Sequence, residues 1–333
     1  MSRTHTLAVL LATIVALANT SAQAVQRTFV ASFGADTNTA ANCSLAAPCR
    51  GFAAAQTVTD NNGEIIVLDS AGYGAVTITK SIAIIAPTGV YGGISVFPGA
   101  NGVTIATLGV NVVLRGLNIN GQGGNRGIEI TADNSLTVEN CVISNLTGNG
   151  ILVNGVIDVN ITDSIIRRNG ARGINLQNGV TATITRAVVS GNNDTGIQLE
   201  GIGSATTTTA DIADSTMDGN FNGVRAISTI ATAVIRVSVR DSRAVRNVSA
   251  GLSAQSNAAA TVSLSASNNI VANNGNGIDA FSAGTRVWAS GNTVSDNAGA
   301  GLQNSSAIFE SAGNNAVRNN GANSGIITVV ATQ

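Results

Sequence analysis

Five polar residues in the middle of the chain have the types and spacing needed to hydrogen-bond a carbohydrate. They are Asn175, Gln177, Gln198, Glu200 and Arg225. Side chains two apart in a strand point to the same face, so these amides, the acid and the arginine are expected on one outward surface. Such groups can hydrogen-bond a sugar or uronate chain. We predict a ligand-binding face here. Because none of the five is aromatic, the alternative is a solvated polar face.

A second set of charged residues recurs at one equivalent outward position after Asn140, namely Asp163, Arg186, Asp214 and Asp241. Asp214 beside Asp241 would place like charges on neighbouring strands, which raises one pKa or attracts a cation. Asn and Asp are also good turn residues, and we favour that interpretation. We therefore assign no catalytic residue to this position.

Metal-binding residues are scarce. His5 is the only histidine, the side chain that most commonly binds metals. Lys80 is the only lysine. A metal site would need histidine or clustered cysteine, so we expect no metal and no cofactor. Cys43 and Cys49 lie six residues apart around Pro48, which predicts a small disulfide loop in an exported protein. Cys141 is left over, and we expect it to be a packed, unreactive thiol.

The first 24 residues, Met1 to Ala24, have the features of a secretory signal peptide. Arg3 provides the positive region, Leu7 to Ala18 the apolar region, and Ala22-Gln23-Ala24 the cleavage site. We expect Sec-type export to the periplasm or the extracellular space, without membrane insertion because the apolar run is too short to span a bilayer. With 17 basic and 18 acidic residues, the chain also lacks the basic surplus expected of a nucleic-acid-binding protein.

The elements that must position these residues are repeats. A glycine followed by an aliphatic residue recurs in steps of 23, 23, 23, 27, 28, 26, 24 and 24 from Gly127 to Gly325. Three further sets keep phase with it. They are the apolar Val138, Ile161, Ile184, Ile212, Val239, Leu264 and Val287; the apolar Ile143, Ile166, Val189, Met217, Ala244, Val271, Val294 and Val317; and Asn145, Asn169, Asn192, Asn220, Asn247, Asn274, Asn297 and Asn320. Cys141 aligns with small residues, Ser164, Ala187, Ser215, Ser242, Ser267 and Ser290.

Three short apolar-polar alternations per repeat predict three strands per coil. At ~3.3 Å per residue, 23 residues trace one three-sided coil, so the fold class is all-β, a parallel β-helix of about eleven coils. We expect a single domain over 25–333 with an N-terminal cap at about 43–60. Within the cap, Pro48 to Gln56 is expected to form a short helix that shields the first strands.

The repeats lengthen in the middle of the chain. The distance from each recurring glycine to the next apolar residue is 11, 11 and 11, then 16, 16 and 13, then 10. We expect longer turns at 201–211, 228–235 and 255–260, stacked into a ledge beside the five polar residues. Trp288 and Phe281 are expected to point outward, and we assign them no role.

These repeats resemble the right-handed parallel β-helix, or pectate-lyase-like, superfamily over nearly the whole chain after residue 24. The opening is the most specific part: Cys43 to Phe52, then 63–68, 72–74 and 76–82, is similar to exported bacterial β-helix repeat proteins of unassigned activity. The resemblance implies catalytic elements in some members: Gly-His with Arg-x-Lys, Arg-x-Pro-x-x-Arg, or Asp-Pro-His-Asp. This chain contains none of them.

We therefore expect an exported, non-catalytic β-helix that binds extracellular polysaccharide or a cell-surface partner. One alternative is a polysaccharide lyase or hydrolase with a carboxylate/arginine site on the middle coils. The other is a passive surface or adhesive scaffold without a ligand site.

Overall fold

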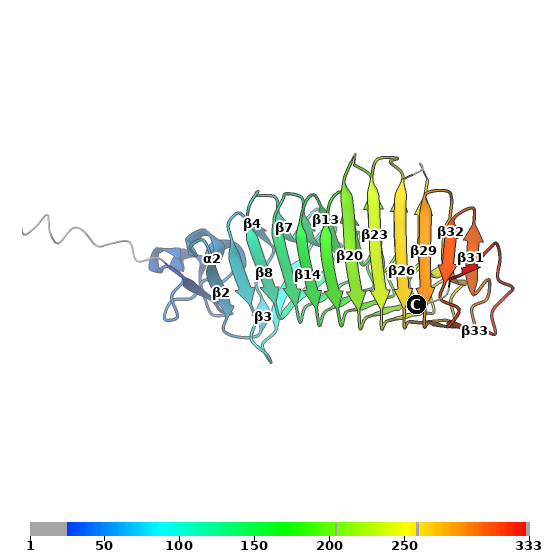
Figure 1. The fold of residues 1–333 in the computed structure, drawn as a ribbon. Helices are drawn as coiled ribbons and strands as arrows, with labels where there is room; N and C mark the ends of the chain where they lie inside the picture. The colour runs from blue at the N-terminus through cyan, green and yellow to red at the C-terminus, as the bar shows by residue number, and fades with distance from the viewer. Residues whose placement is uncertain (1–24, 204, 258–259, 331–333) are drawn as a thin grey trace, which may run out of the picture.

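The computed structural model describes residues 25–203, 205–257 and 260–330. The expected signal peptide, residues 1–24, lies outside them. The described chain forms a right-handed parallel β-helix of about ten turns in a single domain, with three parallel sheets running along its axis (Figure 1). This confirms the predicted fold class. This number is slightly lower than the predicted eleven. The outermost strands, β1 and β34, belong to one sheet only and do not complete a turn.

Each coil passes through the three sheets in the same order, which we call sheets A, B and C. Sheet A contains β1 (Arg27–Val30), β2 (Gly63–Val67), β5 (Ile82–Ile85), β8 (Asn111–Arg115), β11 (Ser135–Glu139), β14 (Asp158–Thr162), β17 (Thr181–Thr185), β20 (Thr207–Ala213), β23 (Val234–Arg240), β26 (Thr261–Ser267), β29 (Thr285–Ser290), β32 (Ile308–Ser311) and β34 (Thr328–Val329).

Sheet B contains β3 (Ala71–Gly72), β6 (Gly92–Val96), β9 (Leu117–Gly121), β12 (Val142–Ser144), β15 (Ile165–Arg167), β18 (Val188–Ser190), β21 (Thr216–Asp218), β24 (Arg243–Val245), β27 (Ile270–Ala272), β30 (Thr293–Ser295) and β33 (Ala316–Arg318). Sheet C contains β4 (Val76–Ile78), β7 (Asn101–Ile105), β10 (Arg126–Ile130), β13 (Ile151–Asn154), β16 (Ile174–Gln177), β19 (Ile197–Gly201), β22 (Val224–Ser228), β25 (Ala250–Ser256), β28 (Asn276–Phe281) and β31 (Leu302–Ser305).

The N-terminal end of the stack is covered by a 3₁₀ turn, η1 (Asp36–Ala41), and a helix, α2 (Phe52–Val58) (Figure 1). Phe52 is fully buried and packs on Tyr73, with ring centroids 5.3 Å apart. The helix begins four residues later than predicted, because the amide of Cys49 bonds to Phe29 and those of Arg50 and Gly51 bond to Asp36. None of the helices in the described part of the chain is long and apolar enough to cross a membrane.

In-register stacking explains the repeated residues. Ile151, Ile174, Ile197 and Val224 are partners on successive strands of sheet C, and each side chain is fully buried. A Cβ atom on Gly127 would lie 2.6 Å from the carbonyl oxygen of Gly150. Close approach of neighbouring coils, and not a positive φ, therefore requires glycine at this position.

The asparagine column is a buried hydrogen-bonded ladder from Asn169 to Asn320. The amide oxygen of Asn220 accepts bonds from the backbone and side-chain nitrogens of Asn192, at 3.0 and 2.9 Å, and its side-chain nitrogen donates to Val189 O at 3.0 Å. Asn145 was wrongly placed in this column. It has φ of 62°, and the ladder position in its coil is Leu146, whose amide donates to Asn169.

The left-handed residues are the ones directly before the ladder. Arg168, Gly191, Gly219 and Arg246 have φ between 53° and 63°, so the ladder residues complete the turn instead of making it. A single left-handed residue turns the chain from sheet B toward sheet C in each of these coils.

The lengthened repeats extend strands and add little loop. β20, β23 and β26 have 7 residues each, against 5 in β11, β14 and β17, and they rise above their neighbours (Figure 1). We call these three strands, with the ends of β19, β22 and β25, the raised segment. Its interior is made of small side chains such as Ser228, Ala233 and Ala260, all fully buried.

The lengthened coils also extend further along the chain than the sequence indicated, into the coils that begin at Gly251 and Gly277. Val239 pairs with Ala266, and Ala266 with Ala289, so Leu264 and Val287 were assigned to this column wrongly by two residues. The distances from Gly251 to Ala266 and from Gly277 to Ala289 are therefore 15 and 12 residues. The transition back to short coils is therefore gradual.

We expect Asn220→Ala to lower the free energy of unfolding by on the order of 3 kcal/mol, because it leaves the buried donors of Asn192 and the carbonyl of Val189 without partners. Urea unfolding followed by circular dichroism measures the change. Asn193→Ala, an exposed asparagine of a neighbouring turn, is the matched control. Equal stability of the two variants would contradict a structural role for the ladder.

Candidate functional site

The five predicted residues lie together on the outward face of sheet C. Asn175, Gln198 and Arg225 are partners on β16, β19 and β22, and Gln177 and Glu200 are partners in the column two residues further along. Parallel strands are ~4.8 Å apart, so the five side chains occupy a compact area. The structure therefore brings together residues separated by up to 50 positions in the sequence.

Part of this face is covered by the protein itself. Asn175 and Gln198 are each only 1% exposed. Arg172 lies in the turn before β16, and its guanidinium lies 3.8 Å from Glu200 Oε2, at the far end of β19. The Arg172 side chain thus passes over the column that holds Asn175 and Gln198. These two amides were expected to be accessible, and the Arg172 side chain is the physical reason that they are not.

Glu200 is also held from the side, because Gln177 Nε2 donates to its Oε2 at 2.8 Å. Arg172 additionally lies 3.2 Å from Asp194. Gln177 and Glu200 are therefore bonded to each other, whereas Asn175 Oδ1 and Gln198 Oε1 are buried without a hydrogen-bond partner among the described residues. Arg225 is the half-buried member at the end of the set.

Beyond Arg225, over β22, β25 and β28, the same face has a hollow of about 250 Å³. We call it the sheet C hollow. Its lining comprises Phe221, Asn222, Arg225, Ser249, Ser253, Gln255, Asn276, Asp279, Phe281 and Gln303. Arg225, Ser253 and Asp279 are partners on the three strands, so the two charged residues are ~10 Å apart with a serine between them.

Asp279 is the most unusual group in the hollow. It is 3% exposed, and its Oδ2 accepts a bond from Asn276 Nδ2 at 3.2 Å. Its Oδ1 is buried without any hydrogen-bond partner in the described residues. Burial raises the pKa of Asp279 to about 7, against a smaller opposing effect of Asn276. A buried carboxyl with a free oxygen can donate or accept a proton near neutral pH.

Asn276 is fixed in place by the next coil. Its side-chain nitrogen also donates to Gln303 Oε1 at 2.6 Å, and its oxygen accepts a bond from the amide of Ala300 at 3.0 Å. The orientation of Asn276 is therefore determined by two contacts besides Asp279.

Arg225 is half-buried and donates to Gln255 Oε1 at 2.9 Å. Burial lowers its pKa from the ordinary arginine value, although it stays protonated as arginine does in proteins. Two aromatic side chains complete the hollow. Phe221, 46% exposed, precedes β22, and Phe281 ends β28, so they stand on opposite sides of the face.

Sequence reasoning missed Asp279, Asn276 and Phe221, and it assigned no role to Phe281. The available signal was the alignment of coils, which places Asp279 two coils after Arg225 in one column. Phe281 does point outward, as predicted from its alternation.

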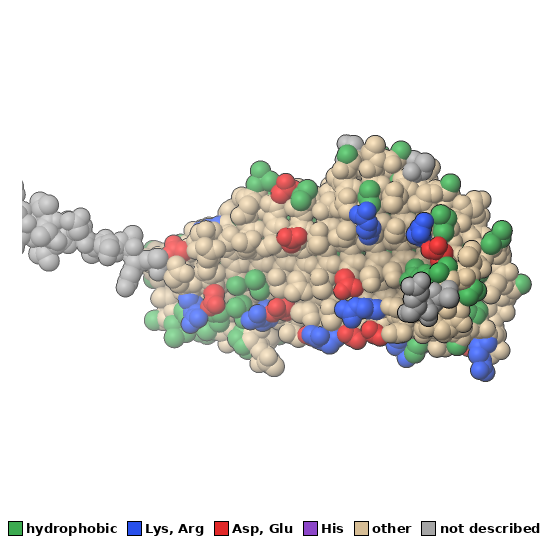
Figure 2. Space-filling model, in the orientation of Figure 1, with side chains coloured by type: hydrophobic (Ala, Val, Ile, Leu, Met, Phe, Trp, Pro, Cys, Tyr) green, Lys and Arg blue, Asp and Glu red, His purple; other side chains and the backbone are tan. Residues whose placement is uncertain are grey.

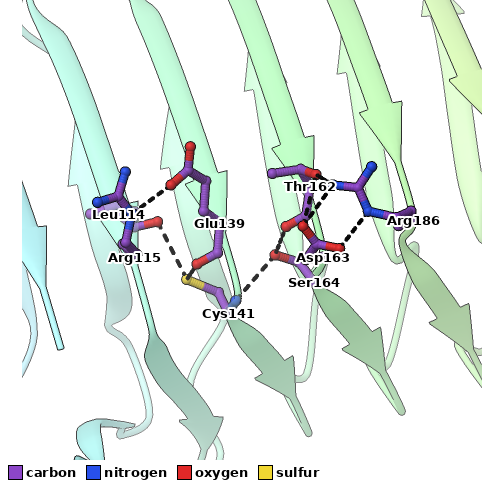
Figure 3. Close-up of polar contacts among 8 residues, drawn as sticks. All are labelled: Leu114, Arg115, Glu139, Cys141, Thr162, Asp163, Ser164 and Arg186. Atoms are coloured by element: carbon purple, nitrogen blue, oxygen red, sulfur yellow. Dashed lines mark hydrogen bonds and ion pairs between the residues drawn. The ribbon is translucent and has the colours of Figure 1, made fainter. Parts of the chain in front are cut away.

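The recurring charged residues at the corner between sheets A and B are turn residues. Asp163, Arg186, Asp214 and Asp241 all have φ of 50° or 51°, which confirms the favoured interpretation. Asp163 Oδ1 accepts a bond from Arg186 Nε at 2.7 Å, and this bond lowers the pKa of Asp163 (Figure 3). The pair is exposed to solvent and contributes little to stability.

Cys141 lies at the same corner and is a packed thiol, as predicted. Its Sγ contacts the carbonyl oxygens of Glu139 and Leu114 at 3.3 and 3.5 Å (Figure 3), and burial raises its pKa to about 11. A thiol with this pKa is unreactive at neutral pH. Its column continues after Ser242 through Asn269 and Asn292, so Ser267 and Ser290 were assigned to it wrongly.

Cys43 and Cys49 form the predicted disulfide, with Cα atoms 4.9 Å apart. No group of three or more His, Cys, Asp or Glu side chains among the described residues could hold a metal ion.

Comparisons with known proteins agree with this architecture. The family model for the right handed beta helix region matches residues 55–213 and 111–294. Pectate lyase Pel9A is similar in structure with a TM-score of 0.63 and 18% identity, covering 88% of this chain and 79% of that chain. The periplasmic alginate epimerase AlgG follows with 0.57 and 11%, covering 81% and 77%. A rhamnogalacturonan lyase has 0.50 and 12%, covering 92% and 85%. A search of curated proteins gives no match.

The raised pKa of Asp279 makes stability depend on pH. The folded protein binds this proton more tightly than the unfolded chain does, so stability falls as the pH rises from 3.8, the ordinary value, to about 7. We expect Asp279→Asn to raise the melting temperature at pH 8 and to change it little at pH 4. The control is Asp296→Asn, which alters an exposed acid. A melting-temperature difference between Asp279→Asn and wild type that is equal at both pH values would contradict the assignment.

Proposed function

The chain belongs to the right-handed β-helix family, and from this premise we propose that it is an exported, non-catalytic protein that binds extracellular polysaccharide through the sheet C hollow. The observation that carries this proposal is the hollow itself. It combines a buried carboxyl with a free oxygen, a half-buried arginine and two aromatic side chains within about 250 Å³. Polar groups that fix orientation between apolar walls are typical of small-ligand sites.

The dimensions and chemistry of the hollow suit one sugar unit of a chain. Phe221 and Phe281 offer apolar surface for a sugar ring, while Arg225, Ser253 and Asp279 offer hydrogen bonds to its hydroxyl or carboxylate groups. Several proteins of similar fold act on polysaccharides, by the names of their structures. The Cys43–Cys49 disulfide supports export, because such bonds persist in oxidising compartments.

A second candidate function, acid-base catalysis on a polysaccharide, is favoured by Asp279 alone. A carboxyl with a pKa of about 7 can abstract or donate a proton at neutral pH, and Arg225 could neutralise a uronate carboxylate nearby. The sequence after residue 24 contains no histidine and none of the catalytic elements named above, so we give binding precedence. A passive scaffold remains the third alternative.

The binding experiment uses a glycan array of extracellular polysaccharides, followed by calorimetric titration of the best binder. We expect Arg225→Ala to weaken binding at least about tenfold, because a hydrogen bond to a charged group contributes ~1.5–3 kcal/mol. The matched control is Arg243→Ala, an exposed arginine on β24, which should bind like wild type. No binding to any glycan, or equal affinity of the two variants, would overturn the proposal.

Catalysis is separated from binding by product assays on the same polymers, using unsaturated-product absorbance and reducing ends. Under our proposal neither signal rises above that of a protein-free control. A signal that Asp279→Asn abolishes while binding persists would establish the catalytic alternative instead. We expect Phe281→Ala to reduce affinity without affecting the melting temperature, because Phe281 lies at the edge of the hollow.

A further inference from the structure

Two buried amide oxygens on sheet C are not explained by the sheet C hollow. Asn175 Oδ1 and Gln198 Oε1 make no hydrogen bond within the described residues, although both side chains are buried. A buried acceptor without a donor costs folding free energy, and native proteins satisfy most such groups. The two residues are partners on β16 and β19, ~4.8 Å apart. They therefore form a pair of unused acceptors on one face.

Arg172 covers this pair of acceptors and is itself held by long contacts. Its Nε lies 3.2 Å from Asp194 Oδ2 but is buried without a hydrogen bond within the described residues. Its guanidinium lies 3.8 Å from Glu200. Arg126 occupies the equivalent position two coils earlier and donates a 2.8 Å hydrogen bond to Glu129. Arg172 is thus positioned by ion-pair contacts that a ligand can replace.

A second arginine makes displacement of Arg172 easier. Burial lowers the pKa of Arg225; Asp194 and Glu200 oppose this shift, and the charge of Arg172 adds to it. The two arginines therefore lie within each other's field, on either side of Gln198. This charged cluster belongs to sheet C and lies away from the sheet A face that Figure 2 shows, which is mostly uncharged. Moving Arg172 aside would relieve a repulsion between like charges.

The two acceptors continue the line of the hollow. Asn175, Gln198, Arg225, Ser253 and Asp279 are successive partners in one column across β16, β19, β22, β25 and β28. We call this column the sheet C strip. It is roughly 19 Å long at ~4.8 Å per strand. The hollow occupies only its half from Arg225 to Asp279, and Arg172 covers the other half.

We propose that Arg172 is a gate on the sheet C strip. A sugar chain that fills the hollow displaces the Arg172 side chain and extends along the helix axis onto β19 and β16, where its hydroxyls donate to the two amide oxygens. An extended peptide fits less well, because its donors on one side recur every second residue, ~6.8 Å apart, and not at the ~4.8 Å spacing of the acceptors. This inference rests on the proposed function and makes Arg172 the residue that limits the length of chain bound.

The test compares two-unit and six-unit fragments of the polysaccharide that binds best on the glycan array, using calorimetric titration. We expect Arg172→Ala to bind the six-unit fragment about threefold or more tightly than wild type, because no ion pair has to be broken, and to bind the two-unit fragment equally. Adding Asn175→Ala/Gln198→Ala should remove this gain, because it deletes the acceptors. The matched control is Arg126→Ala, which should bind both fragments like wild type.

A measurement without ligand tests the cover itself. Asn175→Cys should react with N-ethylmaleimide at least about tenfold faster when combined with Arg172→Ala than alone. Cys141 is packed and Cys43 and Cys49 are bonded to each other, so they contribute little background. Equal labelling rates, or a two-unit fragment that binds while the six-unit fragment gains nothing from Arg172→Ala, would refute the gate and leave the proposed function standing. Failure of both fragments to bind wild type would overturn the proposed function as well.

Discussion

The in-register stacking of parallel strands is the constraint on which the rest of this molecule depends. Every strand bonds along the axis to the equivalent strand of the next coil, so equivalent residues become neighbours ~4.8 Å apart. Each position in the repeat must therefore be compatible with copies of itself. Buried aliphatic residues, amides that both donate and accept, and glycine meet this requirement, and they are the residues that recur.

Charged residues do not meet it, and the candidate site on sheet C lies where they interrupt a column. On sheet C, Asn175 and Gln198 are followed by Arg225, Ser253 and Asp279. At one end of the face the protein satisfies its charges internally through Arg172 and Glu200. Buried oxygens without a hydrogen-bond partner among the described residues occur at both ends of the face, on Asn175 and Gln198 and on Asp279. The face is covered over β16 and β19 and carries a hollow over β22, β25 and β28.

The fold could be predicted from periodicity, because a stack converts spacing in the sequence directly into position. The Ile143 column was assigned correctly throughout. The Val138 column was assigned wrongly after Val239. Two strands are longer in these coils, so the number of residues after the glycine no longer identifies the equivalent position. Sequence patterns also do not show side-chain paths, so the position of Arg172 over Asn175 and Gln198 could not be foreseen. Asp279 does not repeat the residue type of the neighbouring coils, so only the alignment of coils could have placed it in line with Arg225.

The raised segment shows that the three corners of a coil differ in how much they tolerate. From β11 to β30 the corner between sheets A and B keeps one length and turns at a single left-handed residue, and the corner between sheets B and C varies by one residue without loss of strand pairing. The corner between sheets C and A accepts up to five extra residues, yet the strands on either side keep their pairing. The sheet C hollow borders this corner through Gln255 and Phe281. Insertions and deletions at this corner can thus change the outer surface of a coil while the buried columns keep their partners.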